Sequence, residues 1–382
     1  MRHMKNQSAL LLSLFLTTTL TTSCHAKTHE IGEGSNELPA ATDANTISPT
    51  SNMTAPRSGH TATLLLNGQV LIAGGMERNG VLFNSAELYD PTTGRFTAAT
   101  RSMNTQRVGH SATLLPSGRV LIAGGWSREG VLASAELYEP RTGTFTSTGA
   151  MSSVRGDFTA TLLSNGKVMV AGGAGEGDRA VATAEVFDPD SGTFTATGKM
   201  DNVRTMHTAV LLPDGKVLVA GGGDYQHPLA SAELYDPTSG LFARTGNMTV
   251  PRYKQAAILL AEGNVLVVGG SDGRDWQGRY ANAEIFNPAK GVFSAVGNMN
   301  TARFKLPGAV ALLKNGKVLI AAGGEQVEIY DPASKTFSVA AGRMDAARFY
   351  STATLMTDGR VLVVGGYDNH SVASAKAWTY KS

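Results

Sequence analysis

Seven arginines recur along the chain, each four residues after a methionine. A planar guanidinium group suits carboxylates, so seven arginines around one opening could bind an acidic peptide. Six glutamates recur in phase with them, and this joint repetition favours structural Arg–Glu ion pairs instead. Lys376 stands where we expect the seventh glutamate, so Arg348 is the arginine expected to lack its partner. The arginines are Arg57, Arg107, Arg155, Arg204, Arg252, Arg303 and Arg348, and the glutamates are Glu87, Glu136, Glu185, Glu233, Glu284 and Glu328.

Histidines follow the first, second and fourth of these arginines by three residues, as His60, His110 and His207. Three histidines could bind a metal ion if they met at one point. Their setting inside strand-like sequence and their spread along the chain favour a repeated structural residue. We therefore expect no metal site and no cofactor.

The last three arginines are followed by aromatic and charged residues in place of histidine. The pairs are Tyr253-Lys254, Phe304-Lys305 and Phe349-Tyr350. Aromatic side chains with charges between them suit the recognition of sugars, peptides or acidic groups, although packing beneath a surface would use the same residues.

The elements that position these residues also repeat. After each arginine comes a strand-like run, a two-residue turn such as Asn67-Gly68, and a second apolar run that ends in two glycines, as at Gly74-Gly75. Asn-Gly is typical of a tight hairpin because both residues need positive φ. A third run carries an aromatic residue, and a fourth run carries a phenylalanine in six copies. Each unit therefore predicts four antiparallel strands.

Units of about 50 residues with these features resemble the kelch repeat. The resemblance covers residues 46–382 and implies an all-β fold, a seven-bladed kelch-type β-propeller with four antiparallel strands per blade. The seventh unit ends after its third strand, and Ile47 stands where the missing phenylalanine would fall. We therefore expect residues 46–53 to complete the last blade from the N-terminal end.

Loop lengths predict where the variable face is uneven. The loop after the glycine pair has 12 residues in unit 5 (271–282) and only two in unit 6. A missing loop beside a tall one predicts a notch in the rim, which we take as the candidate ligand-binding surface. Its residues are Tyr253, Lys254, Arg274, Asp275, Trp276, Arg279, Tyr280, Lys305, Phe349, Tyr350, Tyr367 and His370.

The first 24 residues have a basic start, an apolar run and a polar end at Cys24, which is the layout of a signal peptide. Cys24 resembles a bacterial lipoprotein cleavage site, with ordinary cleavage after Ala26 as the alternative. We expect residues 25–45 to be a polar tether, and residues 46–382 to form the propeller. The protein is expected to be exported, anchored to the bacterial envelope by a lipid on Cys24 or free outside the cytoplasm.

Composition excludes several other classes of protein. Lys and Arg number 33 against 31 Asp and Glu, a balance that argues against nucleic-acid binding. The single cysteine excludes an internal disulfide and a thiolate zinc cluster. It also excludes the cysteine-dependent copper chemistry of galactose oxidase, which is an enzyme with kelch-type blades. Glycine is abundant, at 44 of 382 residues, which fits many tight turns.

We accordingly expect a monomeric binding or scaffold protein that recognises a protein or carbohydrate partner through its variable-loop face. One alternative is a carbohydrate-modifying enzyme similar to the kelch-type sialic acid epimerases, for which Asp157 and Arg155 would be candidate acid–base residues. Another is a structural envelope protein. An enzyme would need a perturbed acidic residue near an arginine in a deep central pocket, whereas a binding protein would show an aromatic surface.

Overall fold

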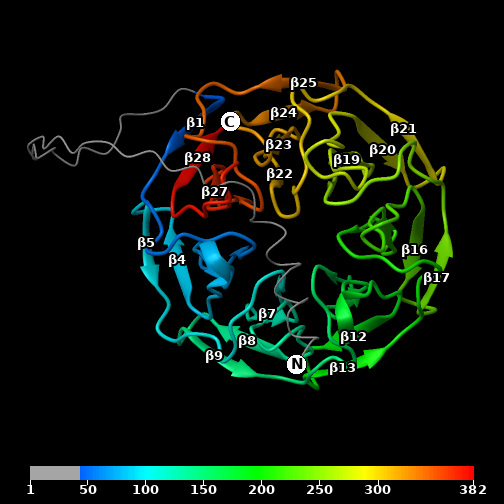
Figure 1. Ribbon diagram of the computed structural model, residues 1–382, viewed down its shortest axis with the longest axis horizontal. Coiled ribbons are helices and arrows are strands. Elements are labelled where there is room, and N and C mark those ends of the chain that lie inside the picture. Colours follow the sequence, from blue (N-terminus) through cyan, green and yellow to red (C-terminus); the bar gives the residue numbers. More distant parts are fainter. Residues whose placement is uncertain (1–43) are drawn as a thin grey trace, which may run out of the picture.

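The computed structural model describes residues 44–382; the predicted signal peptide, Cys24 and nearly all of the tether lie outside that range. Seven four-stranded antiparallel sheets stand in a ring around a central axis (Figure 1). The fold is a seven-bladed β-propeller, as the sequence predicts. Among the described residues no helix is long and apolar enough to cross a membrane.

Each blade runs from an innermost first strand to an outermost fourth strand. Blades 1 to 3 contain β2 (Thr61–Leu64), β3 (Val70–Ala73), β4 (Ala86–Asp90) and β5 (Arg95–Ala98); β6 (Ser111–Leu114), β7 (Val120–Ala123), β8 (Ala135–Glu139) and β9 (Thr144–Ser147); and β10 (Thr159–Leu162), β11 (Val168–Ala171), β12 (Ala184–Asp188) and β13 (Thr193–Ala196). Blades 4 and 5 contain β14 (Thr208–Leu211), β15 (Val217–Ala220), β16 (Ala232–Asp236) and β17 (Leu241–Arg244); and β18 (Ala256–Leu259), β19 (Val265–Val268), β20 (Ala283–Asn287) and β21 (Val292–Ala295). Blades 6 and 7 contain β22 (Val310–Leu312), β23 (Val318–Ile320), β24 (Glu328–Asp331) and β25 (Thr336–Val339); and β26 (Thr352–Leu355), β27 (Val361–Val364), β28 (Ala377–Lys381) and β1 (Thr46–Pro49).

Burial follows the position of a strand within its blade. The second strands, such as β3, are fully buried, because neighbouring blades cover both of their faces. The first strands, such as β2, are half-buried along most of their length. Solvent therefore reaches the axis of the ring and the inner edges of the first strands.

The ring closes inside blade 7. Strand β1 pairs antiparallel with β28, and Ile47 lies opposite Tyr380 with 3% of its surface exposed. In the other blades a phenylalanine takes the place of Ile47 and packs on the aromatic residue of the third strand, as Phe96 packs on Tyr89 with ring centroids 4.8 Å apart. The N-terminal segment therefore completes the last blade, as predicted, and covers the edge of β28 that would otherwise be exposed.

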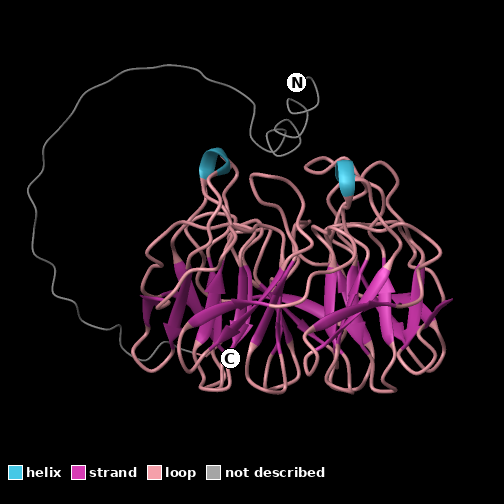
Figure 2. Ribbon diagram, turned by 90° about the horizontal axis from the view of Figure 1, so that it is seen from below, coloured by secondary structure: helices cyan, strands magenta, loops and turns pink. Residues whose placement is uncertain are grey.

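The two faces of the ring differ in the length of their connections. Figure 2 shows short turns on one face and long loops on the other, where two short 3₁₀ helices, η1 (Arg78–Gly80) and η2 (Glu176–Asp178), lie at the loop tips. The connections between blades and the loops after the second strands share this second face, which we call the loop face.

The glycine pair that ends the second strand is required by contacts between blades. A Cβ on Gly74 would lie 2.6 Å from the Arg107 carbonyl oxygen and 2.7 Å from His110 Cε1, both in the next blade. Blade 6 departs from the predicted pattern, because Ala322 and Gly323 occupy the positions of Gly74 and Gly75, and its loop therefore begins one residue earlier than expected. The residue of blade 7 at the position of His110 is the small Ser351, which leaves space for the extra methyl group.

Candidate functional site

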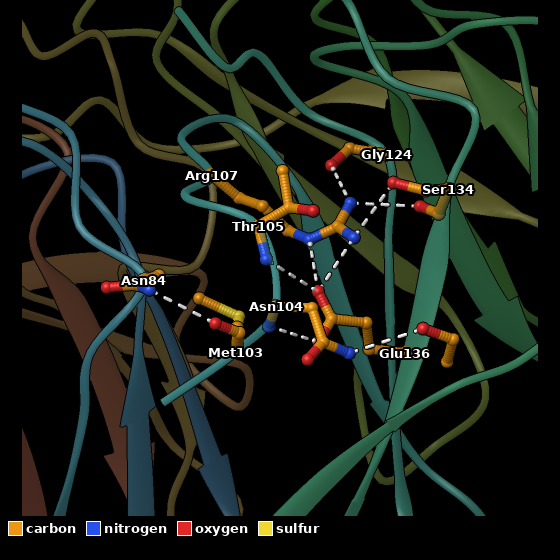
Figure 3. A network of polar contacts seen from close by, with 9 residues as sticks. Asn84, Met103, Asn104, Thr105, Arg107, Gly124, Ser134 and Glu136 are labelled. Atoms are coloured by element: carbon orange, nitrogen blue, oxygen red, sulfur yellow. Dashed lines mark hydrogen bonds and ion pairs between the residues drawn. The ribbon is translucent and has the colours of Figure 1, made fainter. Parts of the chain in front are cut away.

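The repeated arginines hold their blades together from within. Arg107 donates hydrogen bonds to the Gly124 and Ser134 carbonyls, at 2.9 Å each, and to Glu136 Oε1 at 2.9 Å (Figure 3). Glu136 Oε2 in turn accepts the backbone N–H of Asn104 at 2.7 Å. One Arg–Glu pair therefore joins the connection between blades, the end of the second strand, the loop and the third strand.

The other five Arg–Glu pairs repeat this geometry at 2.7–3.1 Å, and all twelve side chains are almost completely buried. Burial lowers the pKa of Arg107, and the hydrogen bond that Arg107 donates to Glu136 opposes that change by stabilising the charged guanidinium. Arg155 is held in the same way by Glu185. Its guanidinium is therefore engaged by hydrogen bonds within the blade and is not free to act on a ligand with Asp157.

The seventh arginine, which the sequence predicts to lack a partner, does have one. Val363 pairs with Trp378 as Ile72 pairs with Glu87, so Trp378, and not Lys376, takes the glutamate position. The Arg348 guanidinium lies over the Trp378 ring at 5.6 Å and binds Asp345 at 2.7 Å. Lys376 binds the other oxygen of the same carboxylate. The expected unpaired arginine is thus held by an aromatic ring and an exposed carboxylate.

The three histidines are separate links between blades. The Nε2 atoms of His60, His110 and His207 each lie 2.9–3.2 Å from a threonine hydroxyl on the first strand of the preceding blade. Burial lowers the pKa of each to about 3, so they are neutral at physiological pH. No group of three or more metal-ligating side chains occurs within residues 44–382.

A closed circle of backbone hydrogen bonds surrounds the axis on the loop face. Its seven hydrogen bonds measure 3.0–3.4 Å and pass from each blade to the next. The second residue after each arginine has a left-handed backbone there, with φ between 46° and 62°. We call these positions the inner ring: Gly59, Gly109, Asp157, Met206, Lys254, Lys305 and Tyr350.

Five members of the inner ring are not glycine, and a left-handed backbone costs each of them about 1 kcal/mol. Such strain concentrates at functional sites, which directs attention to the axis. Asp157 of blade 3, Lys254 of blade 5 and Tyr350 of blade 7 interact electrostatically although they come from non-adjacent blades. Their side chains are therefore near enough to influence one another across the mouth of the channel.

At this mouth, Asp157 carries a carboxylate that is unpaired within the described part of the chain. Within residues 44–382 no hydrogen bond or ion pair reaches its carboxylate; only its backbone groups are bonded. Burial raises the pKa of Asp157 to about 7, and the nearby charge of Lys254 opposes the change only in part. Its Oδ1 and the Trp126 ring both lie within 3 Å of the point that a Cβ on Gly109 would occupy.

Tyrosines complete the surroundings of Asp157. The pKa of Tyr350 is raised well above its ordinary value, first by burial and then by the negative charge of Asp157. The pKa of Tyr225, on the loop of blade 4, is raised for the same two reasons. We call Trp126, Asp157, Tyr225 and Tyr350 the mouth site.

A second polar group lies beside the mouth site. Asp275, on the loop of blade 5, binds Lys254 Nζ at 2.6 Å and lies 4.0 Å from Lys305 Nζ. Lys305 Nζ also donates to the Tyr367 hydroxyl at 2.6 Å. Burial and the charge of Lys254 lower the pKa of Lys305 to about 7. We call Tyr253, Lys254, Asp275, Lys305 and Tyr367 the Asp275 network, because they share that carboxylate or its cations.

The expected notch is occupied by the tall loop beside it. Trp276 packs edge-on against Phe304 of blade 6 and Phe349 of blade 7, with ring centroids 5.1 and 4.7 Å apart. Both phenylalanines and Tyr367 are buried, whereas 41% of Trp276 is exposed. Of these predicted binding residues, Phe349 and Tyr367 therefore support the surface from below, and Trp276 forms it.

The remaining predicted residues lie at the edge of this region or outside it. Arg279 lies over the Trp276 ring at 5.7 Å, and Tyr280 lies under the buried Arg252 at 5.4 Å. Arg274 pairs with Asp272 on its own loop. The side chain of His370 is 88% exposed on the loop of blade 7.

The sequence pattern does not indicate Trp126 or Tyr225 of the mouth site, and it offers Asp157 only as a candidate acid–base residue. The sequence does show that the position of Asp157 varies, because the second residue after each arginine is Gly, Gly, Asp, Met, Lys, Lys and Tyr in the seven repeats. Trp126 and Tyr225 lie on variable loops, whose course the repeats do not define.

Comparisons with known proteins agree with this architecture. The family model described as Kelch motif matches residues 204–249, which span blade 4. Blade 4 therefore resembles a kelch blade. The other blades repeat its four strands and its buried arginine, so the likeness to the kelch motif extends in pattern around the seven-bladed β-propeller. A comparison with curated protein sequences gave no match.

Among solved structures, one similar chain is described as a novel fungal alcohol oxidase with catalytic diversity among the AA5 family, in complex with copper. The TM-score is 0.73 at 19% identity, over 89% of this chain and 76% of that chain. At this identity the likeness concerns the fold alone.

Proposed function

We propose that the protein is a carbohydrate-binding propeller whose ligand enters the mouth site on the loop face. The observation that carries the proposal is the Asp157 carboxylate, which lacks a donor from the described chain and stands among aromatic side chains. Sugar hydroxyl groups supply donors to such a carboxylate, while aromatic faces stack on the apolar faces of the sugar ring. The half-exposed Trp276 extends this surface toward blades 6 and 7.

A glycan array with a single ring variant tests the proposal. Tyr350→Gly removes one wall of the mouth site and places at that position the residue that blades 1 and 2 already carry, so the backbone should accept it. We expect binding of glycans by the unchanged protein and a loss of about tenfold or more in the variant, as is usual for an aromatic anchor. Leu241→Ala, an exposed change on the outer strand β17, is the control and should bind normally.

Two results would overturn the proposal. One is the absence of any glycan ligand on the array. The other is glycan binding that Tyr350→Gly leaves unchanged, which would place the ligand elsewhere on the ring.

Acid–base chemistry on a carbohydrate is a second candidate, which the pKa of about 7 at Asp157 favours. One measurement distinguishes this function from binding alone: NMR would show turnover of an array ligand by an enzyme. Arg155 takes no part in this alternative, since it is paired with Glu185.

We also propose that the protein acts as a monomer outside the cytoplasm, held by a lipid on Cys24 or released after Ala26. The support for export is the basic, apolar and polar order of residues 1–24. The mass of the mature N-terminal peptide distinguishes the two forms, and retention of the unprocessed leader would contradict both.

A further inference from the structure

We propose that the ligand of the mouth site carries a primary ammonium group among its hydroxyl groups, as a glucosamine unit does, and that Asp157 receives this group. The inference rests on the proposed function and names its ligand class. It follows from the charges around Asp157, the contacts that occupy its neighbours and the aromatic faces beside it.

The cations nearest the mouth are already engaged. Lys254 binds Asp275 at 2.6 Å, and Lys305 binds Tyr367 and lies 4.0 Å from Asp275. Only 8% of the Lys254 side chain and 2% of the Lys305 side chain are exposed. Neither ammonium group is therefore free to pair with Asp157 or with an acidic ligand.

The other ionisable groups that face Asp157 do not compensate its charge. They are the phenols of Tyr225 and Tyr350, whose raised pKa values keep them neutral. Burial raises the pKa of Asp157 to about 7, and the charge of Lys254 lowers it only in part, so the protein supplies too little positive charge to stabilise the carboxylate. A ligand ammonium group would supply that charge together with strong hydrogen bonds, whereas a uronic or sialic acid would place a second carboxylate beside the first.

The walls of the site also suit a cation. The Trp126 ring lies against the backbone of Gly109 and Gly156, beside Asp157 Oδ1. Aromatic faces attract ammonium groups, and tryptophan does so most strongly. An amino sugar offers its amine to Asp157 and its apolar ring face to the aromatic side chains, so one ligand satisfies both features.

Calorimetry with three matched sugar series tests the inference: short oligomers of glucosamine, of N-acetylglucosamine and of glucose. We expect the unchanged protein to prefer the glucosamine series by about tenfold or more, the usual effect of a charge-assisted contact. Asp157→Asn keeps the shape of the side chain and tolerates a left-handed backbone, and it should abolish the preference. Asp190→Asn, in an exposed turn on the opposite face, is the matched control.

The pH dependence gives an independent readout. The amine is charged in acid, and Asp157 loses its proton as the pH rises, so affinity for glucosamine oligomers should increase from about pH 5 toward about pH 7. Binding near pH 7 should release a proton, because the ammonium group favours the ionised carboxylate. Asp157→Asn should show neither the increase nor the release.

Folding of the variants is a check with an expected sign. A carboxyl whose pKa is raised by folding makes the protein less stable as the pH rises from about 4 to about 7, so Asp157→Asn should melt no lower than the unchanged protein near neutral pH. Asp157→Gly, the residue of blades 1 and 2 at this position, is a second variant that should also lose the preference.

The outcomes separate the two proposals. Equal binding of the acetylated and free-amine series would overturn the amine inference and leave carbohydrate binding standing. A preference that persists in Asp157→Asn would overturn the role of Asp157. If the protein binds none of the three series but binds other glycans through Tyr350, the amine inference fails alone.

Discussion

The guanidinium of Arg107 shows why the repeat keeps a charge in its interior. Its five hydrogen bonds to Gly124, Ser134 and Glu136 satisfy a group that would be costly to bury alone. The in-phase spacing of arginine and glutamate was enough to anticipate this pairing from the sequence. It was not enough in blade 7, where the register of β28 is set by Trp378 and Tyr380 packing against β27 and β1.

Removal of a buried arginine should cost more in a blade with a buried glutamate than in blade 7. Arg107→Gln leaves Glu136 charged and buried, and we expect unfolding free energy to fall by about 3–5 kcal/mol. Arg348→Gln leaves Asp345, which is exposed and keeps its bond to Lys376, so the loss should be smaller. Chemical denaturation of both variants measures the difference.

The comparison has a built-in control, because both changes delete the same side chain at equivalent positions of the repeat. Equal losses in the two variants would show that the packing of the arginine stem, and not its buried partner, sets the cost.

Asp157 marks the limit of sequence reasoning at this scale. Aspartate is a common residue, and Asp157 becomes a candidate ligand-binding group only because three other blades bring Lys254, Tyr350 and Trp126 near it. Proximity across a closed ring depends on blade number and on side-chain direction at the inner ring, which local spacing does not specify. The repeats could show that this position varies, but not that its occupants meet.

Among the elements, the loop of blade 5 is the one that its neighbours reshape. The short loop of blade 6 leaves space over Phe304, and Trp276 fills it while Asp275 reaches Lys254 and Lys305. Loop lengths predicted the place of this irregularity correctly. They could not show that the tall loop bends into the space, because that depends on contacts made by its tip.

Trp276→Ala should loosen this loop without unfolding the ring. Trp276 is 41% exposed and contacts the rim, while the strands beneath keep their buried partners, so the melting temperature should change by only a few degrees. We expect faster proteolytic cleavage within residues 271–282 and weaker binding of any glycan found on the array. Val203→Ala, an exposed change in a connection on the same face, is the control.

An unchanged cleavage rate would show that the Asp275 network alone holds the loop. Unchanged glycan affinity with faster cleavage would confine the ligand to the mouth site and remove Trp276 from the binding surface.

The whole molecule depends on a closure that joins the two ends of the described chain. Strand β1 pairs with β28 over four residues, and the backbone of Ile47 also bonds Ala341 of blade 6 at 3.0 Å. The sequence predicted this closure because a count of strands left one blade incomplete and the spacing to Met53 placed Ile47 at the missing position. Ring closure is a property of the entire repeat count, so it was the most predictable feature of the fold.

Ile47→Glu should open the ring at this seam. The change places a charge among the buried side chains of Tyr380, Trp378 and Met344, where an unpaired charge is strongly unfavourable. We expect β1 to detach, the free energy of unfolding to fall by about 3 kcal/mol or more, and amide protons of β28 to exchange faster than those of β11 on the far side of the ring. The exposed edge of β28 should also promote association at high protein concentration, which gel filtration would detect. Ser48→Glu, the next residue on the less buried side of the same strand, should cause none of these changes. If Ile47→Glu lowers exchange protection equally in all seven blades, the ring unfolds as one unit and the seam is no weaker than the rest; if neither stability nor exchange changes, β1 does not carry the closure.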